Sequence, residues 1–239
     1  LRPKDKIALS FCQPFFGSCS ELKEEESSIL GYLSSDVFDS TSCYVSTTLE
    51  NSDVFEDFKK KISLLNSDTK IESADNYNIK SINDKKYKHV IVQKAISNDR
   101  QEDSNVITLI KNNGLKNKTG DQKFVPTRIF SSPKNIVSSY LKSLFSCDSY
   151  VRYSKSSRFS SKIEISFNNI VFVKQIQHLL SRFGIFSSFQ SKNVNKKTEY
   201  LLSITKNSHV RIFINEIWFI GKDDFQKQVK ENTESIVDG

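Results

Sequence analysis

Residues 29–37 read ILGYLSSDV, an apolar stretch with helical spacing whose one acidic residue, Asp36, stands near its C-terminal end. Residues 141–149 read LKSLFSCDS and repeat the arrangement, with Asp148 at the matching position. The C-terminal end of a helix is the negative pole of the helix dipole, which disfavours a carboxylate there by about 0.3–1 kcal/mol. The same unfavourable placement in two related stretches indicates that both aspartates serve a function.

The sequences that follow the two stretches are also similar, which indicates an internal duplication. Each apolar helix is followed by a predicted strand, at 43–49 in the first unit and 162–167 in the second, then by a polar turn and an amphipathic helix. Further strands are predicted at 89–96 and 199–205, and a last helix at 209–217. Each unit then has the order αββαββα, so the fold class expected is α+β.

The amphipathic helix of each unit has a clear apolar face. In the second unit, Asn168 or Asn169 can cap the helix and Gly184 is a natural stop; its apolar face carries Val173, Ile176, Leu179, Leu180 and Phe183. In the first unit, Asp53 is the expected cap, and the face carries Val54, Phe58, Ile62 and Leu65. Spacings of three and four residues place each set on one side of a helix, which must pack against a core.

The net charge of the 239-residue chain is +7, which favours a polyanionic partner. The charge is concentrated: ten basic residues lie between Arg152 and Lys206, opposed only by Glu164 and Glu199. The alternative is an ordinary solvated surface in a lysine-rich protein. Because these basic residues alternate with strand-like sequence, we favour a sheet that binds nucleic acid.

The cysteine pattern argues against a structural zinc site. Cys12, Cys19, Cys43 and Cys147 form no CxxC pair, and the chain has only three histidines. The cysteines are typical of reduced thiols in an intracellular protein, and no targeting signal is seen. No apolar run approaches the length of about 20 residues that a membrane span requires, so no membrane partner is expected.

Both nine-residue stretches resemble the motif of the LAGLIDADG homing endonucleases. Gly31 matches the glycine of that motif and Asp36 its final acid, and in the second copy Ser143 and Asp148 stand at these positions. KFVPTRIF, from residue 123, resembles the segment that precedes the second motif in intein-encoded members, and HLLSRFGIFSSF resembles the helix that follows it. INEIWFIGKDDF resembles their closing helix and Gly-Lys turn, so the resemblance covers nearly the whole chain.

The resemblance implies a duplicated αββαββα fold in which two curved antiparallel sheets form a DNA-binding saddle. The two halves would span residues 1–125 and 126–239, within a monomer of pseudo-two-fold symmetry. The boundary falls in the Gly-, Pro- and Asn-rich connector 111–135. The implied activity is a site-specific double-strand cut in a long asymmetric DNA target, as in the homing of inteins and introns.

In this family the two motif helices pack side by side through small residues, a role that would fall to Gly31 and Ser143. Asp36 and Asp148 would then meet beside the unpaired carbonyls of the two helix ends. A hard divalent cation relieves the repulsion between two such carboxylates, and an all-oxygen set of ligands suits Mg²⁺. Both aspartates are therefore the expected metal ligands and catalytic residues.

Each of the two sites also needs a cation that polarises water or stabilises the pentavalent phosphorus. The resemblance assigns this role to Lys123, just before the Phe-Val-Pro sequence, and to Lys222, in the Gly-Lys turn. Two lysines, one for each DNA strand, complete the expected catalytic set.

The predicted DNA contacts lie on strands and turns, because a sheet fits the major groove and alternate side chains of a strand share one face. Double-stranded DNA is the expected partner. The candidates in the first unit are Tyr44, Ser46, Thr48, Lys80, Lys86, Lys88 and Gln93. Those in the second unit are Tyr150, Arg152, Tyr153, Lys155, Arg158, Lys162, Lys192, Lys196 and Lys197.

The two motif copies depart from the family pattern at four positions. Ser34 and Ser146 replace an acidic or glycine residue, and Val37 and Ser149 replace the glycine after the final acid. That glycine eases the turn out of the helix, where valine is strained if φ is positive. Val37 favours an alternative, a descendant of the maturase or regulator type that binds nucleic acid without cleaving it. A further alternative is an unrelated basic α+β scaffold.

Overall fold

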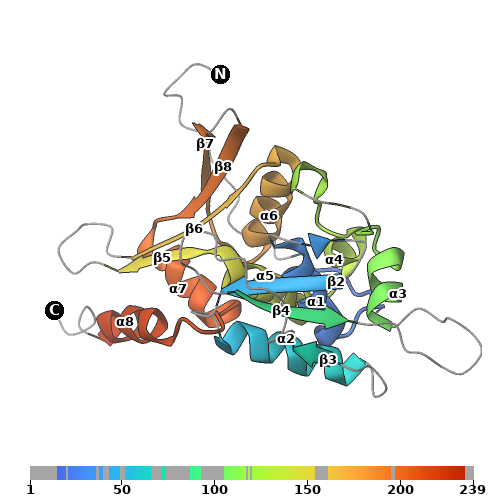
Figure 1. Cartoon of the computed structure of the whole chain (residues 1–239). Coiled ribbons are helices and arrows are strands. Elements are labelled where there is room, and N and C mark those ends of the chain that lie inside the picture. Colours follow the sequence, from blue (N-terminus) through green and yellow to red (C-terminus); the bar gives the residue numbers. More distant parts are fainter. Residues whose placement is uncertain are drawn as a thin grey trace, which may run out of the picture.

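The structure is a computed structural model of the 239-residue chain (Figure 1). It describes residues 15–19, 21–35, 38–39, 43–48, 52–65, 71–73, 87–92, 105–116, 118, 120–153, 161–194 and 197–234. Within these ranges, only the backbone is described for residues 38–39, 43–48, 52, 71–73, 87–92 and 232–234. Asp36 lies outside the described residues.

The described strands form two antiparallel sheets with the same strand order. The first sheet has the order β1-β2-β4-β3 and consists of β1 (Phe38–Asp39), β2 (Cys43–Thr48), β3 (Ile71–Ser73) and β4 (Tyr87–Val92). The second has the order β5-β6-β8-β7 and consists of β5 (Tyr150–Tyr153), β6 (Ser161–Phe167), β7 (Ser188–Val194) and β8 (Lys197–Ile204). The matching orders confirm the predicted α+β fold and its duplication.

The described helices come from both halves of the chain. They are α1 (Glu24–Ser34), α2 (Ser52–Leu65), α3 (Asn105–Asn112), α4 (Thr127–Ser131), α5 (Lys134–Asp148), α6 (Ile170–Arg182), α7 (Asn207–Glu216) and α8 (Asp223–Glu234). The motif helices α1 and α5 lie side by side at the centre, with α2 beneath them in the view of Figure 1. Among the described residues, no helix is both long and apolar enough to span a bilayer.

The predicted boundaries of the amphipathic helices are confirmed in one unit and corrected in the other. In α6, Asn169 is the cap, since its Oδ1 accepts bonds from the backbone N–H groups of Val171 and Phe172 at 2.8 and 3.3 Å. Gly184 follows the helix with a positive φ of 74°. In the first unit the helix begins at Ser52, so the expectation that Asp53 is the cap is wrong, and Asp53 lies in the first turn.

The two motif helices end differently. Helix α5 ends at Asp148, as predicted, whereas α1 ends at Ser34, two residues before Asp36. Ser35 already has an extended backbone, and its hydroxyl donates to the Tyr32 carbonyl at 2.6 Å. A serine side chain that bonds to the preceding turn competes with continuation of the helix, which accounts for the earlier end.

Small side chains let α1 and α5 approach closely. The hydroxyls of Ser28 and Ser143 are 2.6 Å apart, and Ser27 donates to the Ile136 carbonyl at 2.6 Å. A Cβ atom added to Gly31 would lie 2.3 Å from the carbonyl oxygen of Tyr140. Gly31 and Ser143 thus lie in the contact between the helices, where a larger residue in place of Gly31 would force them apart.

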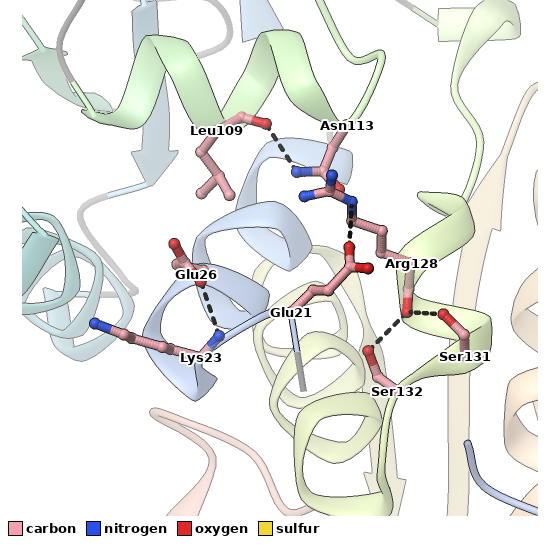
Figure 2. Close-up of polar contacts among 8 residues, drawn as sticks. All are labelled: Glu21, Lys23, Glu26, Leu109, Asn113, Arg128, Ser131 and Ser132. Atoms are coloured by element: carbon pink, nitrogen blue, oxygen red, sulfur yellow. Dashed lines mark hydrogen bonds and ion pairs between the residues drawn. The ribbon is translucent and has the colours of Figure 1, made fainter. Parts of the chain in front are cut away.

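The connector between the two units is more ordered than its composition indicates. It contains the 3-10 turn Gly120–Gln122 and the short helix α4. Arg128 of α4 pairs with Glu21 at 3.1 Å, just before α1, where the backbone N–H of Lys23 donates to Glu26 (Figure 2). The beginning of the second unit is therefore fixed to the N-terminal end of α1.

Replacing Gly31 by alanine should destabilise the protein, although alanine in a helix normally stabilises by about 1 kcal/mol relative to glycine. The added methyl group overlaps the Tyr140 carbonyl, and overpacking of this kind costs about 1–3 kcal/mol. Denaturant unfolding should show a free energy of unfolding lower by that amount. Lys60→Ala, at an exposed position of α2, is the control and should change stability little. A Gly31→Ala variant as stable as the wild type would contradict the close packing.

Candidate active site and nucleic-acid interface

Lys123 lies at the C-terminal end of α1. Its side chain is buried, with the residue 4% exposed, and its ammonium group donates a hydrogen bond to the carbonyl oxygen of Ser35. Ser35 directly precedes Asp36 in the sequence. The structure therefore brings Lys123 to the end of the first motif, although these residues are 88 positions apart.

The segment that carries Lys123 is held by the second half of the chain. Asn169 Nδ2 donates to the carbonyls of Asp121 and Lys123 at 2.6 and 2.7 Å, while its Oδ1 caps α6. The backbone N–H of Val125 donates to Gln175 of α6 at 2.8 Å. One asparagine thus begins a helix and fixes the backbone of a candidate catalytic lysine.

Lys222 occupies the equivalent place at the end of α5. Its Nζ donates to the carbonyls of Phe145 and Ser149 at 3.2 and 2.5 Å and to the Ser149 hydroxyl at 2.6 Å. The ammonium group also lies 5.1 Å from the ring centre of Phe219. The two lysines predicted from sequence therefore lie at the C-terminal ends of the two motif helices, one at each.

The turn before Lys222 is strained and well anchored. Trp218 has a positive φ of 72°, which is unusual for a bulky residue. The N–H of Ile220 donates to the Ser146 hydroxyl at 2.9 Å, and the N–H of Phe219 donates to Gln226 Oε1 at 3.0 Å. Contacts to α5 and α8 thus determine where Lys222 lies.

Burial controls the protonation of Lys222 and its neighbour Cys147. Burial lowers the pKa of Lys222 from 10.5 to about 8, and the nearby Cys147 and Asp148 limit this change. Burial raises the pKa of Cys147 to about 12, assisted by the charge of Asp148, so the thiol stays protonated at neutral pH. The ammonium groups of Lys123 and Lys222 both act on that thiol in the opposite direction. Cys147 therefore lies within the electrostatic influence of both candidate sites.

The residues that precede the two aspartates come together. A hydrogen bond with the side chain of Ser35 lowers the pKa of Cys147, and these two residues are followed by Asp36 and Asp148 in the sequence. Asp148 is exposed at the last position of α5. The described ends of α1 and α5 are therefore in contact through Ser35 and Cys147, while Asp36 lies outside the described residues.

The donor atoms at this edge fit a hard cation. They are the carboxylate of Asp148 and the terminal carbonyls of α5, while the protonated Cys147 is a poor ligand. Oxygen donors suit Mg²⁺ or Ca²⁺ rather than zinc. Within the described part of the chain, no cluster of three or more His, Cys, Asp or Glu side chains could hold a metal by itself. A complete site would need Asp36.

The second sheet has one face packed on the core and one open face. The core face carries Ile163, Ile165 and Phe167 of β6, paired with Ile204, Leu202 and Tyr200 of β8. The opposite face, called the open face below, carries Tyr150, Arg152, Lys162, Glu164, Ser166, Ser188, Gln190, Lys192, Lys197, Glu199, Leu201 and Ser203. Five of the predicted DNA contacts lie there: Tyr150, Arg152, Lys162, Lys192 and Lys197.

One predicted contact lies on the core face of the second sheet, and the register of the first sheet separates another from its predicted partners. Tyr153 pairs with the buried Ser161 and packs against the hydrophobic core, because it is out of phase with Tyr150 and Arg152. Lys88 pairs with Thr47, so it alternates out of phase with the residues of β2 predicted to bind DNA. Those residues, Tyr44, Ser46 and Thr48, pair with Ile91, His89 and Tyr87.

Several candidates lie outside the described residues and stay predictions. They are Lys80, Lys86, Gln93, Lys155, Arg158 and Lys196. Conversely, Glu164 and Glu199 lie on the open face, although no DNA contact is predicted for them from the sequence. The signal was available, because the alternation in SKIEISF, residues 161–167, places Lys162, Glu164 and Ser166 on one face of a strand.

The lowered pKa of Lys222 predicts that the stability of the metal-free protein, measured with a chelator present, depends on pH. Below pH 8 the amine is charged in both the native and the unfolded state. The whole cost of burying the charged amine then lowers the free energy of unfolding. Between pH 8 and 10.5 the native state loses its proton first, so stability rises with pH. Relative to Lys222→Met, the free energy of unfolding of the wild type should therefore increase by up to about 3 kcal/mol across this window.

The exposed Lys60 provides the control, since Lys60→Met should follow the wild-type pH profile. Denaturant unfolding at pH 7.5 to 10.5 measures both differences. A constant stability difference between Lys222→Met and the wild type would contradict the burial of the charged amine.

Comparison with known proteins agrees with this geometry. Residues 135–217 match the family described as LAGLIDADG-like domain. The chain is 32% identical over 116 residues to glutamine–fructose-6-phosphate aminotransferase of Methanocaldococcus jannaschii. It is 31% identical over 114 residues to the replicative DNA helicase DnaB of Synechocystis sp.. These matches cover 47% and 46% of this chain but only 10% and 13% of the relatives, so the chain spans a small part of their length.

Solved structures have the same architecture at low sequence identity. I-DmoI in complex with DNA and Mn is similar with a TM-score of 0.51 and 13% identity, over 82% of this chain and 96% of that one. The N-terminal LAGLIDADG domain of DUF199/WhiA is similar with a TM-score of 0.52 and 13% identity, over 87% and 86%. The chain therefore has the LAGLIDADG fold, and its residues 135–217 match the LAGLIDADG-like domain.

Proposed function

We propose that this chain is a homing endonuclease that makes a site-specific double-strand cut in a long asymmetric DNA target by Mg²⁺-dependent hydrolysis. The observation that carries the proposal is the pair of lysines. Lys123 and Lys222 come from distant parts of the chain, yet each donates to backbone carbonyls at the C-terminal end of a different motif helix. A fold that only bound DNA would have no need of two matched, buried ammonium groups at that edge.

The chemistry follows from the groups that meet there. Asp36 and Asp148, with helix-end carbonyls, would hold divalent ions, which activate water and stabilise the leaving oxygen when bound. Lys123 and Lys222 would each stabilise negative charge at one scissile phosphate. Since Lys222 ionises near pH 8, it can also hold or release a proton at neutral pH.

DNA would bind across the open face and its counterpart on the first sheet. Arg152, Lys192 and Lys197 are exposed there, and basic side chains on a twisted antiparallel sheet suit the major groove and its phosphates. I-DmoI, which has this fold, has been crystallised with DNA and Mn and with DNA and Ca. A monomer is expected because the chain supplies both halves, divided near residue 125.

The relatives support an origin within inteins. An aminotransferase, a replicative helicase and a replication factor C small subunit have different activities, yet each shares a stretch of 114 to 122 residues with this chain. Each stretch occupies only 10–13% of the relative. A segment inserted into unrelated host proteins would give this pattern.

The alternative function is binding of nucleic acid without cleavage. The observation that favours it is Val37, which stands where the motif has glycine. A DNA-binding regulator would also bind DNA selectively, so cleavage is the property that distinguishes it from the proposed endonuclease.

Replacing either aspartate should abolish cleavage and preserve binding. The substrate is the duplex made by joining the DNA on the two sides of this coding sequence. With Mg²⁺ the wild type should cut both strands, whereas Asp36→Asn and Asp148→Asn should cut neither and still bind the duplex, because the fold and the open face are intact. Gel analysis of the products and a binding titration measure the two outcomes.

The exposed Asp224, in the first turn of α8, provides a matched control, and Asp224→Asn should cleave like the wild type. Full cleavage by Asp36→Asn or Asp148→Asn would reject the nuclease site. Selective binding by the wild type with no cut in Mg²⁺ would favour the alternative.

Salt provides an independent test of the DNA-binding surface. If about six to ten phosphates are neutralised, affinity should fall by about 10³–10⁵ between 50 and 200 mM salt. Fluorescence anisotropy with the same duplex in chelator measures the slope. An affinity that hardly changes with salt would exclude a basic sheet as the binding surface.

A further inference from the structure

The open face of the second sheet carries two acidic side chains in the middle of a basic surface. Glu164 lies on β6 and Glu199 on β8, and their side chains are 12% and 25% exposed. A carboxylate on a DNA-binding surface is repelled by the phosphates. An outward-facing carboxylate on such a surface can instead accept a hydrogen bond from a donor on a base edge in the major groove.

Each carboxylate is held by a serine and a lysine in the same way. Glu164 Oε1 accepts bonds from Ser203 Oγ and from Lys162 Nζ, both at 2.8 Å. In the second group, Glu199 Oε1 accepts from Ser166 Oγ at 2.5 Å, and its Oε2 lies 2.9 Å from Lys192 Nζ. These bonds hold both carboxylates in place in the DNA-free protein.

The carboxylate of Glu199 remains a charged acceptor. Ser166 and Lys192 hold the pKa of Glu199 below its ordinary value. Both bonds that the structure gives to Glu164 go to Oε1, which leaves the lone pairs of Oε2 for a donor on the DNA. Glu164 thus presents Oε2 beside an ammonium donor, and Glu199, whose two oxygens each have one of these contacts, presents its remaining lone pairs beside Lys192.

A C·G base pair presents the complementary pattern in the major groove. Cytosine offers the N4 amino donor, and guanine offers the O6 and N7 acceptors. We propose that the Lys162–Glu164 and Lys192–Glu199 pairs each read one C·G base pair, with glutamate accepting from cytosine and lysine donating to guanine. This inference rests on the proposed DNA-binding function and deepens it.

The sheet register predicts the distance between the two base pairs. Glu164 is opposite Ser203, and Glu199 lies four residues before Ser203 on the same strand. At about 3.3 Å per residue, the two groups are about 13 Å apart along the strand. With a rise of about 3.4 Å per base pair, the C·G pairs should be separated by about four positions.

Selection from a random duplex library in chelator tests the inference, because it requires neither cleavage nor a known target. The wild type should select two C·G pairs about four positions apart. Glu164→Gln should relax one of them and Glu199→Gln the other, with affinity for the wild-type site lowered by about tenfold for each. Glutamine keeps the size of the side chain and favours adenine, so the relaxed position should shift towards A·T.

Two further variants separate readout from folding. Ser203→Ala keeps the carboxylate of Glu164 and its contact with Lys162 but removes the hydrogen bond from Ser203, and should weaken selection at the same position as Glu164→Gln. Glu216 lies on α7, away from the open face, and its carboxylate is ion-paired with Lys134 of α5 at 2.6 Å. Glu216→Gln should therefore leave the selected sequence unchanged.

The outcomes distinguish failure of this inference from failure of the proposed function. Selected sequences that are identical for the wild type and both glutamine variants would overturn the readout. So would a uniform gain of affinity for all sequences, which would mean that the glutamates only neutralise lysines. A wild-type protein with no sequence-selective DNA binding would overturn the proposed function as well.

Discussion

The close contact between α1 and α5 is the constraint on which the rest of the structure depends. Gly31 lies so near the Tyr140 carbonyl that no side chain fits between them, and Ser28 and Ser143 bond across the same contact. Two helices that approach this closely bring their C-terminal ends to one edge. Lys123 and Lys222 then reach the two helix ends from segments that lie far away in the sequence.

The groups gathered at that edge are unfavourable in a folded protein without ligands. Burial lowers the pKa of Lys222, and burial keeps the thiol of Cys147 neutral against the influence of two ammonium groups, which act to lower its pKa. The carboxylate of Asp148 at the negative end of the α5 dipole is also disfavoured. The well-packed apolar interior around Tyr140, Leu144 and Phe145 stabilises the fold enough to tolerate this cluster. Divalent ions and DNA phosphates would provide the charges that complement it.

Much of the fold could be predicted because it follows local rules. The duplicated motif, the apolar face of α6 and the cap at Asn169 are all determined by residues close together in the sequence. The ends of the helices are harder to predict. Helix α1 ends where the Ser35 hydroxyl bonds back to Tyr32, and helix propensities alone do not distinguish this end from a helix that continues to Asp36. The short helix α4 in the connector was missed because its contacts, such as Arg128 with Glu21, come from distant residues.

The candidate site was predictable only in part. Lys123 and Lys222 were found through family resemblance, but nothing local to Asn169 indicated that its amide also fixes the backbone of Lys123. Tyr153 is adjacent to Arg152 on a strand, so the two side chains face opposite sides of the sheet and cannot both contact DNA there. The alternation of side chains along β6 likewise places Glu164 on the same face as Lys162. Residues that face each other across strands depend on register, which the sequence of one strand does not determine.

The most direct test is a crystal structure of the complex with its DNA target and Mn²⁺, using the anomalous scattering of manganese to locate the ions. The account predicts anomalous peaks within coordination distance of the carboxylates of Asp36 and Asp148, between the two helix ends and the scissile phosphates. Carboxylates that point apart, with no manganese between them and the DNA, would contradict it.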